Sequence, residues 1–260
     1  MKRIHIRSGS QRVKVGSRLN RAPSLFGAGY NVGIEHSLTS LGASVRQLVK
    51  RVPFTLTLLA LITSAALITG AFQGAIDPAW FERVGYAPCD LWHLRLDRVL
   101  ISALFTERPR GFYQALWLIA LGVGGVEWRF GSAVAFGCFW GLHTLTLALN
   151  TLLLGMASVF VPVSGIVSAR DIGPSAGYFG ALAVFFGTLA SRDSERATWW
   201  RWFNPVVLTG LASVLMWSLI VPTRHIVITA NLAHVITYAL GGWVAQPPPR
   251  RRGSNVGAVR

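Results

Sequence analysis

The sequence Asp171-Ile172-Gly173-Pro174-Ser175-Ala176-Gly177-Tyr178-Phe179-Gly180 begins a long apolar segment. From Ile172 to Ala190 this segment contains no charged residue. A run of about 18 or more such residues is long enough to cross the hydrocarbon core of a bilayer as a helix. We therefore expect Ser175, with a glycine two positions away on either side, to lie where water meets the membrane.

The rest of the chain is also organised in apolar blocks. Of its residues, 52% are hydrophobic and 13% are charged, whereas roughly 25% are charged in an ordinary soluble domain. Continuous apolar blocks of this length indicate membrane helices. The blocks are Phe54–Phe72, Phe112–Val126, Ser132–Val161, Ile172–Ala190, Pro205–Val221 and Ile226–Ala245. They predict an all-α membrane protein with six transmembrane helices in one domain, residues 51–246.

The net charge of +15 is concentrated at the two ends of the chain. Ten of the 25 Lys and Arg residues precede the first block, and Arg250, Arg251 and Arg252 follow the last one. Six spans place both ends on one side, and segments rich in Lys and Arg mark the cytoplasmic side. We therefore expect a multi-pass membrane protein with cytoplasmic termini. The partner of its basic segments is expected to be the lipid bilayer and not nucleic acid.

The flanks of the membrane domain are predicted to be basic extensions. Residues 1–50 are polar, basic and rich in Gly and Ser, which is typical of a partly disordered cytoplasmic arm. Residues 247–260 form a short basic cytoplasmic tail. Within the arm, apolar residues recur at helical spacing from Ser37 to Arg51. This part is either an interfacial helix on the membrane or a solvated basic linker.

Four polar residues lie inside or at the ends of apolar blocks. His143 and Asn150 are seven residues apart, so they share one face of a helix. They serve either a functional site or hydrogen bonds between helices, of which the second role is the more common. Glu127 and Arg129 end the second block. There they are expected to satisfy helix ends and each other, where charges still reach water.

Ser175 and His234 have the chemistry of a catalytic pair. A serine hydroxyl is a poor nucleophile until a neighbouring base takes its proton, and the pKa of histidine suits that role near neutrality. The glycines at 173 and 177 allow close approach of backbone to the serine. The amide of Ser175, at a helix N-terminus, can donate to an oxyanion. The two cysteines, Cys89 and Cys138, offer no metal cluster, and no cofactor is implied.

Three motifs, in order along the chain, give the sequence a resemblance to the rhomboid intramembrane serine proteases. Gly-Gly-Val-Glu-Trp-Arg-Phe-Gly-Ser at 124–132 is similar to the Glu-x-Arg-x-Gly-Ser that ends the family's second span. Gly-Pro-Ser-Ala-Gly at 173–177 resembles the nucleophile motif that opens the fourth span, and Ala-Asn-Leu-Ala-His at 230–234 resembles the histidine motif of the sixth. The resemblance extends from Arg51 to Ala245. It implies a six-helix rhomboid-like bundle in a bacterial plasma membrane.

The resemblance also implies roles for single residues. Ser175 and His234 would be catalytic, and Phe179, one turn after the serine, would place its ring against the histidine. Gly241 would let the fourth and sixth spans approach each other. The residues implied to bind the oxyanion or support the site are Gly173, Gln114, Phe179 and Asn231. The residues implied to have a structural role are Glu127, Arg129 and Gly241.

The second span departs from the family pattern. Active rhomboids usually carry His-x-x-x-Asn there, sixteen and twelve residues before the glutamate, and the asparagine helps to bind the oxyanion. Counting back from Glu127 gives Gly111 and Ala115, and Thr237 stands where the family usually has a second glycine. Backbone amides, or Gln114 one position away, remain candidates for the missing donor.

Three functions fit these observations. The first is an intramembrane serine protease that cleaves transmembrane segments of other proteins with a Ser-His dyad. The second is a catalytically inactive rhomboid-like protein that binds membrane helices. The third is a transporter or channel that uses His143, Asn150 and His234, although the sequence shows no inverted repeat of the kind common in transporters.

Overall fold

The computed structural model describes residues 46–160, 164–190, 197–221 and 225–246. The predicted arm up to residue 45 and the predicted tail lie outside these ranges. The chain divides into two compact units between Arg46 and Gln47, and the elements below belong to the second unit. The described residues are mostly helical and form no strand. Three helices, at Ser132–Ala157, Trp202–Ile220 and Ile226–Val244, are long and apolar enough to cross a membrane.

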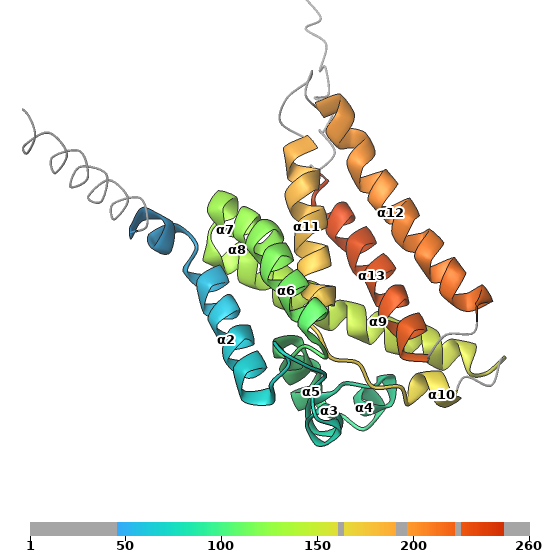
Figure 1. Cartoon of the computed structure of the whole chain (residues 1–260). Helices are drawn as coiled ribbons and strands as arrows, with labels where there is room; N and C mark the ends of the chain where they lie inside the picture. The colour runs from blue at the N-terminus through green and yellow to red at the C-terminus, as the bar shows by residue number, and fades with distance from the viewer. Residues whose placement is uncertain (1–45, 161–163, 191–196, 222–224, 247–260) are drawn as a thin grey trace, which may run out of the picture. The chain divides into compact units, whose positions relative to one another are not determined.

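Each of the six apolar blocks coincides with a helix or a continuous helical run. They are α2 (Pro53–Thr69), the run of α6 (Pro109–Leu118), η2 (Ile119–Val123) and α7 (Gly124–Phe130), the run of α8 (Ser132–Phe136), η3 (Gly137–Gly141) and α9 (Leu142–Ala157), α11 (Ser175–Ala190), α12 (Ala197–Ile220) and α13 (His225–Val244) (Figure 1). The turns η2 and η3 are π-helical. The helices α2 and α11 are apolar but shorter than the three above.

Helix α11 lies among the other long helices, and glycines bring its neighbours close. A Cβ added at Gly122 in η2 would lie 2.8 Å from Cγ of Leu182, and one added at Gly177 would lie 2.5 Å from the ring of Phe139. The side chains of Leu182 and Phe139 therefore pack directly against the backbone of the helical segment that faces them. Such small-residue contacts are the usual way in which membrane helices associate closely.

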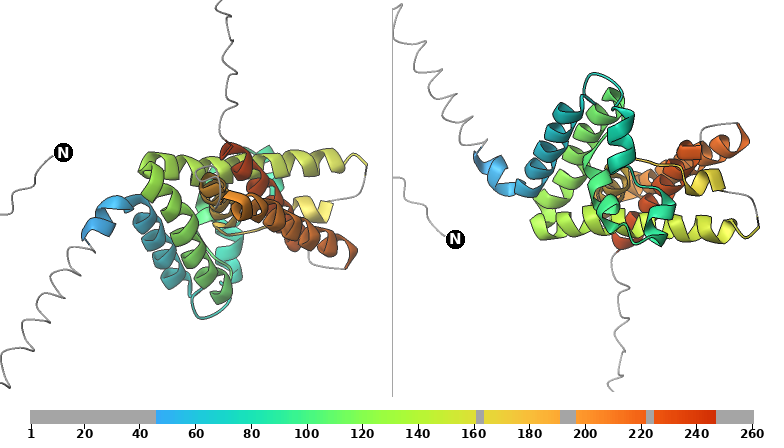
Figure 2. Two further views of the ribbon diagram at one scale, coloured as in Figure 1. Left: turned by 90° about the horizontal axis from the view of Figure 1, so that it is seen from above. Right: turned by 90° about the horizontal axis from the view of Figure 1, so that it is seen from below.

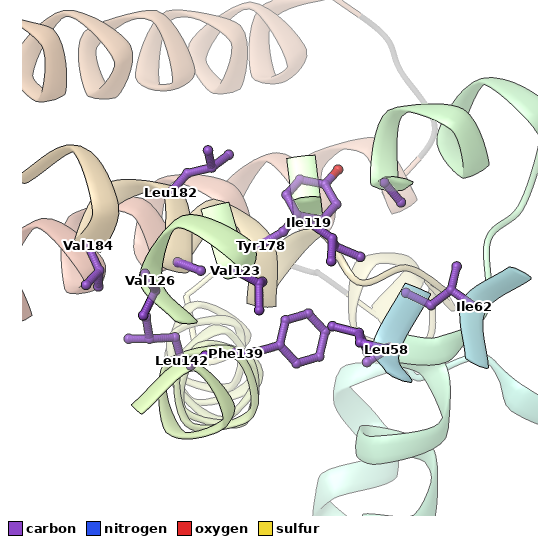
Figure 3. Packing of buried hydrophobic residues seen from close by; sticks show 14 of the residues in the cluster. Leu58, Ile62, Ile119, Val123, Val126, Phe139, Leu142, Tyr178, Leu182 and Val184 are labelled. Carbon is purple, nitrogen blue, oxygen red and sulfur yellow. The ribbon is translucent and has the colours of Figure 1, made fainter. Parts of the chain in front are cut away.

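The main core joins α2, the second helical run, η3 and α11. Figure 3 shows Leu58 and Ile62 of α2 on one side of Phe139 and residues of α11 on the other. Phe139 and Ile62 are fully buried. A core of aliphatic and aromatic side chains without charge is what six apolar blocks predict.

The long connection after α2 is folded rather than open. It contains α3 (Pro78–Val84), α4 (Pro88–Trp92), α5 (Leu96–Ile101) and η1 (Ser102–Leu104). Ile76 and Val84 cluster with Ile172, which precedes α11, while Val99 clusters with Leu147 of α9. The short helices therefore pack beside α9 and the N-terminal end of α11 (Figure 1 and Figure 2).

Candidate active site

Ser175 is the first residue of α11, and the residues before it fix where that helix begins. The residue before a proline is disfavoured in the helical region, and Gly173 has a φ of +156°, which glycine adopts without strain. The N–H groups of Gly177 and Tyr178 both donate to the carbonyl oxygen of Pro174, at 3.0 Å each. The amide of Ser175 consequently lies in the first turn, where helix N–H groups have no intrahelical acceptor.

His234 of α13 lies against α11 through Phe179. The ring centroids of Phe179 and His234 are 4.7 Å apart, with an interplanar angle of 49°. Phe179 follows Ser175 by one helical turn. The structure therefore places the histidine beside the first turns of the helix that Ser175 opens.

The contact between α11 and α13 is close because small residues face each other. A Cβ added at Gly241 would overlap the carbonyl oxygen of Gly180 and lie 2.9 Å from the Cβ of Ala183. The hydroxyl of Thr237 donates to the carbonyl oxygen of Ala176. Ala176 thus pairs with Thr237, and Gly180 pairs with Gly241, so the two helices run parallel. This register brings Ser175, at the start of α11, level with the middle of α13, where His234 lies.

The hydroxyl of Ser175 and the imidazole of His234 are not hydrogen-bonded to each other in the described part of the chain. The Nε2 atom of His234 is buried and has no partner among the described residues. Catalytic hydrogen bonds are often long before substrate binds and tighten only in the complex. The two residues thus lie in one region of the structure without a hydrogen bond between them.

Gly111 and Ala115 of the second helical run have no side-chain hydrogen-bond donor, and the structure shows whether the neighbouring Gln114 could replace one. Ala115 is fully buried, whereas Gly111 and Gln114 are exposed. Neighbouring residues on a helix point about 100° apart, so Gln114 faces away from the buried side that Ala115 occupies. The idea that Gln114 replaces the missing asparagine therefore has no support in this geometry.

The two further residues expected to support the site, Gly173 and Asn231, lie in different environments. The N–H of Gly173 donates to the carbonyl oxygen of Ser102, 3.0 Å away, so this amide already has an acceptor. Asn231 is half-buried on α13 and makes no hydrogen bond within the described ranges. The amide of Ser175 and the side chain of Asn231 are thus both without an acceptor among the described residues, whereas the amide of Gly173 is not.

Glu127 holds the start of α2. Its carboxylate accepts from the N–H groups of Phe54 and Thr55, at 2.8 and 2.7 Å, and from the hydroxyl of Ser132, at 2.6 Å. The side chain is 1% exposed. These N–H groups lie in the first turn of α2, so a negative charge there also complements the helix dipole.

Arg129 stabilises a different helix end. Its guanidinium donates to the carbonyl oxygen of Thr188 near the end of α11, at 3.1 Å. The bonds of the Glu127 carboxylate go to Phe54, Thr55 and Ser132, so the expected contact of Glu127 with Arg129 does not form. Residues two apart on a helix do not face each other.

His143 and Asn150 make hydrogen bonds between helices. The Nε2 atom of His143 lies 2.9 Å from the carbonyl oxygen of Val99 in α5. The Nδ2 atom of Asn150 donates to the carbonyl oxygen of Thr229 in α13, at 3.1 Å. Of the two roles left open by the sequence, the hydrogen-bonding one is thus observed.

An ion cluster that sequence reasoning missed ties the long connection to the segment before Ser175. Arg170 donates to Asp90 at 2.7 Å and to Glu82 at 2.8 Å, and Arg98 also bonds Asp90. Tyr86 and Asp171 exchange two backbone hydrogen bonds, at 2.9 and 2.7 Å. The charged residues of the connection were visible in the sequence, but nothing there indicated Arg170 as their partner.

Asp171, four residues before Ser175, has an unusual environment. Burial raises the pKa of its carboxyl to about 7, and the nearby Glu107 acts in the same direction. The N–H of Ile172 opposes the rise in this pKa. The carboxyl therefore titrates near neutral pH within the segment that positions Ser175.

No group of three or more His, Cys, Asp or Glu side chains within the described ranges is placed to hold a metal ion. Cys89 and Cys138 are both free thiols. Comparison with family models, with curated proteins and with solved structures gives no significant match to this chain. The resemblance to rhomboids therefore rests on the three sequence motifs alone.

Proposed function

We propose that this chain is a rhomboid-like intramembrane serine protease in which Ser175 is the nucleophile and His234 the general base. In this proposal all six helical runs cross a bacterial plasma membrane, with both termini in the cytoplasm. The observation that carries it is the parallel packing of α11 on α13, with the Phe179 and His234 rings 4.7 Å apart. Ser175 and His234, which are 59 residues apart in sequence, thereby lie near each other at the N-terminal end of α11.

The reaction would follow the logic of a serine-histidine dyad. The Ser175 hydroxyl attacks the scissile carbonyl carbon while His234 takes its proton. His234 then gives this proton to the leaving amine as the peptide bond breaks. Water, deprotonated by His234, hydrolyses the acyl-enzyme and frees the serine. The amide of Ser175, at the positive end of the α11 dipole, would donate to the oxyanion.

The proposed substrates are transmembrane segments with a locally unwound stretch. A continuous helix shields its peptide bonds by its own hydrogen bonds and side chains, whereas an unwound segment exposes a carbonyl to attack. Ser175 is half-buried at the start of α11. The site would therefore accept a segment that enters from the end of the bundle where α3 to α5 lie.

A cleavage assay tests the proposal. The purified chain is reconstituted in liposomes with single-span reporter proteins whose spans contain Gly and Pro at different depths. Wild type is expected to cleave at least one reporter, and Ser175→Ala none. Cleavage that persists in Ser175→Ala would overturn the assignment of the nucleophile.

A second function is favoured by the absence of a side-chain oxyanion donor at Gly111 and Ala115. In this alternative the chain is catalytically inactive and binds membrane helices. Removal of one oxyanion donor typically costs about 10²–10³-fold in rate, so Ala115→Asn would raise cleavage if chemistry occurs at all. If the folded wild type binds the reporters, and neither the wild type nor Ala115→Asn cleaves them, the binding function is favoured.

A further inference from the structure

Helices α9 and α13 pack antiparallel along a buried seam. At one end, a Cβ added at Gly180 would lie 2.7 Å from both Leu142 of α9 and Thr237 of α13. At the other end, Asn150 donates to the carbonyl oxygen of Thr229. Leu142 to Asn150 and Thr237 back to Thr229 are each eight residues. The two helices therefore keep one register over about two turns.

The middle of this seam places Thr146 at the level of His234. Thr146 lies four residues from each end of the α9 stretch, and its counterpart halfway along α13 is Ala233. His234 follows Ala233, so it lies at this level about 100° further round α13, on the side of the helix where Phe179 of α11 meets it. Thr146 and Asn150 are each 0% exposed. The Oγ1 of Thr146, the Oδ1 of Asn150 and the Nε2 of His234 are all buried without a hydrogen-bond partner among the described residues.

The hydroxyl of Thr146, like that of Thr55, lacks the bond within its own helix that three other threonines make. Thr57, Thr69 and Thr209 each donate to the carbonyl oxygen four residues earlier on their own helix. Thr146 makes no such bond. Its hydroxyl, which can both donate and accept, therefore keeps its hydrogen-bonding capacity for the seam.

Buried polar groups in proteins almost always have a partner, and a buried water typically bonds two to four of them. We infer that Thr146, Asn150 and His234 hold one buried water molecule that orients the imidazole ring. Thr146 and Asn150 would then be positioning residues for His234. This role rests on the proposed function, although the water site itself does not. The third helical run would thereby orient His234, whereas the second run has only Gly111 and Ala115 at the positions where rhomboids usually have polar side chains.

Replacing Thr146 with valine tests the inference, because valine keeps the shape and removes the hydroxyl. The full chain is labelled with ¹⁵N-histidine in micelles, and the His234 ring signals are assigned by comparison with His234→Gln. Thr146→Val is expected to shift these signals and to slow labelling of Ser175 by a fluorophosphonate about tenfold, as for the loss of one hydrogen bond. Thr146→Ser should restore both, and Thr144→Val, at an exposed position of the same helix, should change neither.

Unchanged His234 signals in folded Thr146→Val would overturn the inference. If Thr146→Val does not fold, a wild-type crystal structure that resolves water decides. An ordered water bonded to the three atoms supports the site, and a dry seam refutes it. If the fluorophosphonate fails to label wild type, the proposed protease function fails, while the ring signals still decide whether the seam holds His234.

Discussion

Replacing Gly241 with alanine is expected to push α11 and α13 apart. The added Cβ would overlap the carbonyl oxygen of Gly180 and lie 2.9 Å from Ala183, inside the 3.4–4 Å of ordinary van der Waals contact. The main obstacle is backbone, which cannot rotate away. Overpacking of this kind costs roughly 1–3 kcal/mol of unfolding free energy, and the better helix propensity of alanine offsets about 0.5–1 kcal/mol of it. A net loss of roughly 0–2.5 kcal/mol of unfolding free energy follows from these two ranges.

The same change should impair the proposed chemistry more than the stability. A misplacement of about 1 Å at a catalytic pair can cost about 10²-fold in rate, and Gly241 lies two turns from His234 on the same helix. Chemical unfolding in detergent micelles gives the stability, and the rate of fluorophosphonate labelling gives the reactivity. The matched control is Gly242→Ala, because a Cβ there meets nothing within 4 Å. If Gly241→Ala were as stable and as reactive as Gly242→Ala, the close-packing argument would be refuted.

Three further predictions concern the rest of the chain. Glu127→Ala should lower the unfolding free energy by about 3–6 kcal/mol, since two charge-assisted bonds to α2 are lost, and Glu127→Gln by less. The rate at which a fluorophosphonate labels Ser175 in the folded fraction of either Glu127 variant should not change. Slower labelling with an unchanged melting temperature would contradict this prediction. Because folded Asp171 keeps its proton up to a pKa of about 7 and the unfolded chain loses it near 4, stability should fall as pH rises from 4 to 7. Unfolding of Asp171→Asn across that range should show a smaller fall, and an identical profile would count against the burial of this carboxyl. Deletion of residues 1–35 should leave the membrane domain folded, as circular dichroism of the purified protein would show; a truncated chain that fails to accumulate would make the arm structural.

The helices were the most predictable part of the molecule. In a bilayer the backbone of an uncharged block of this length must form its hydrogen bonds within the protein, so each block predicted a helix from composition alone. Pro174 also marks where α11 begins, because a proline ring suits the start of a helix and not its interior. The functional arrangement was less accessible. Phe179 and His234 are 55 residues apart, and only the family resemblance indicated that they meet.

The polar contacts could be foreseen as a class but not in detail. Glu127 and Arg129 were expected at helix ends, yet the sequence did not show that they serve different helices, α2 and α11. Gln114 was one position from a missing donor, but helix geometry turns it to the exposed side. Arg170 reaches Asp90 across 80 residues. Such pairings depend on how helices cross, which no local pattern records.

The labelling of Ser175 by a fluorophosphonate tests the central claim most directly, because the probe reacts only with an activated serine. We expect the folded wild-type chain to be labelled, and Ser175→Ala and His234→Ala each to lose labelling. The double variant should be no worse than either single one, since residues that act as one unit are not additive. A well-folded wild type that resists the probe, or labelling that survives in Ser175→Ala, would contradict the account.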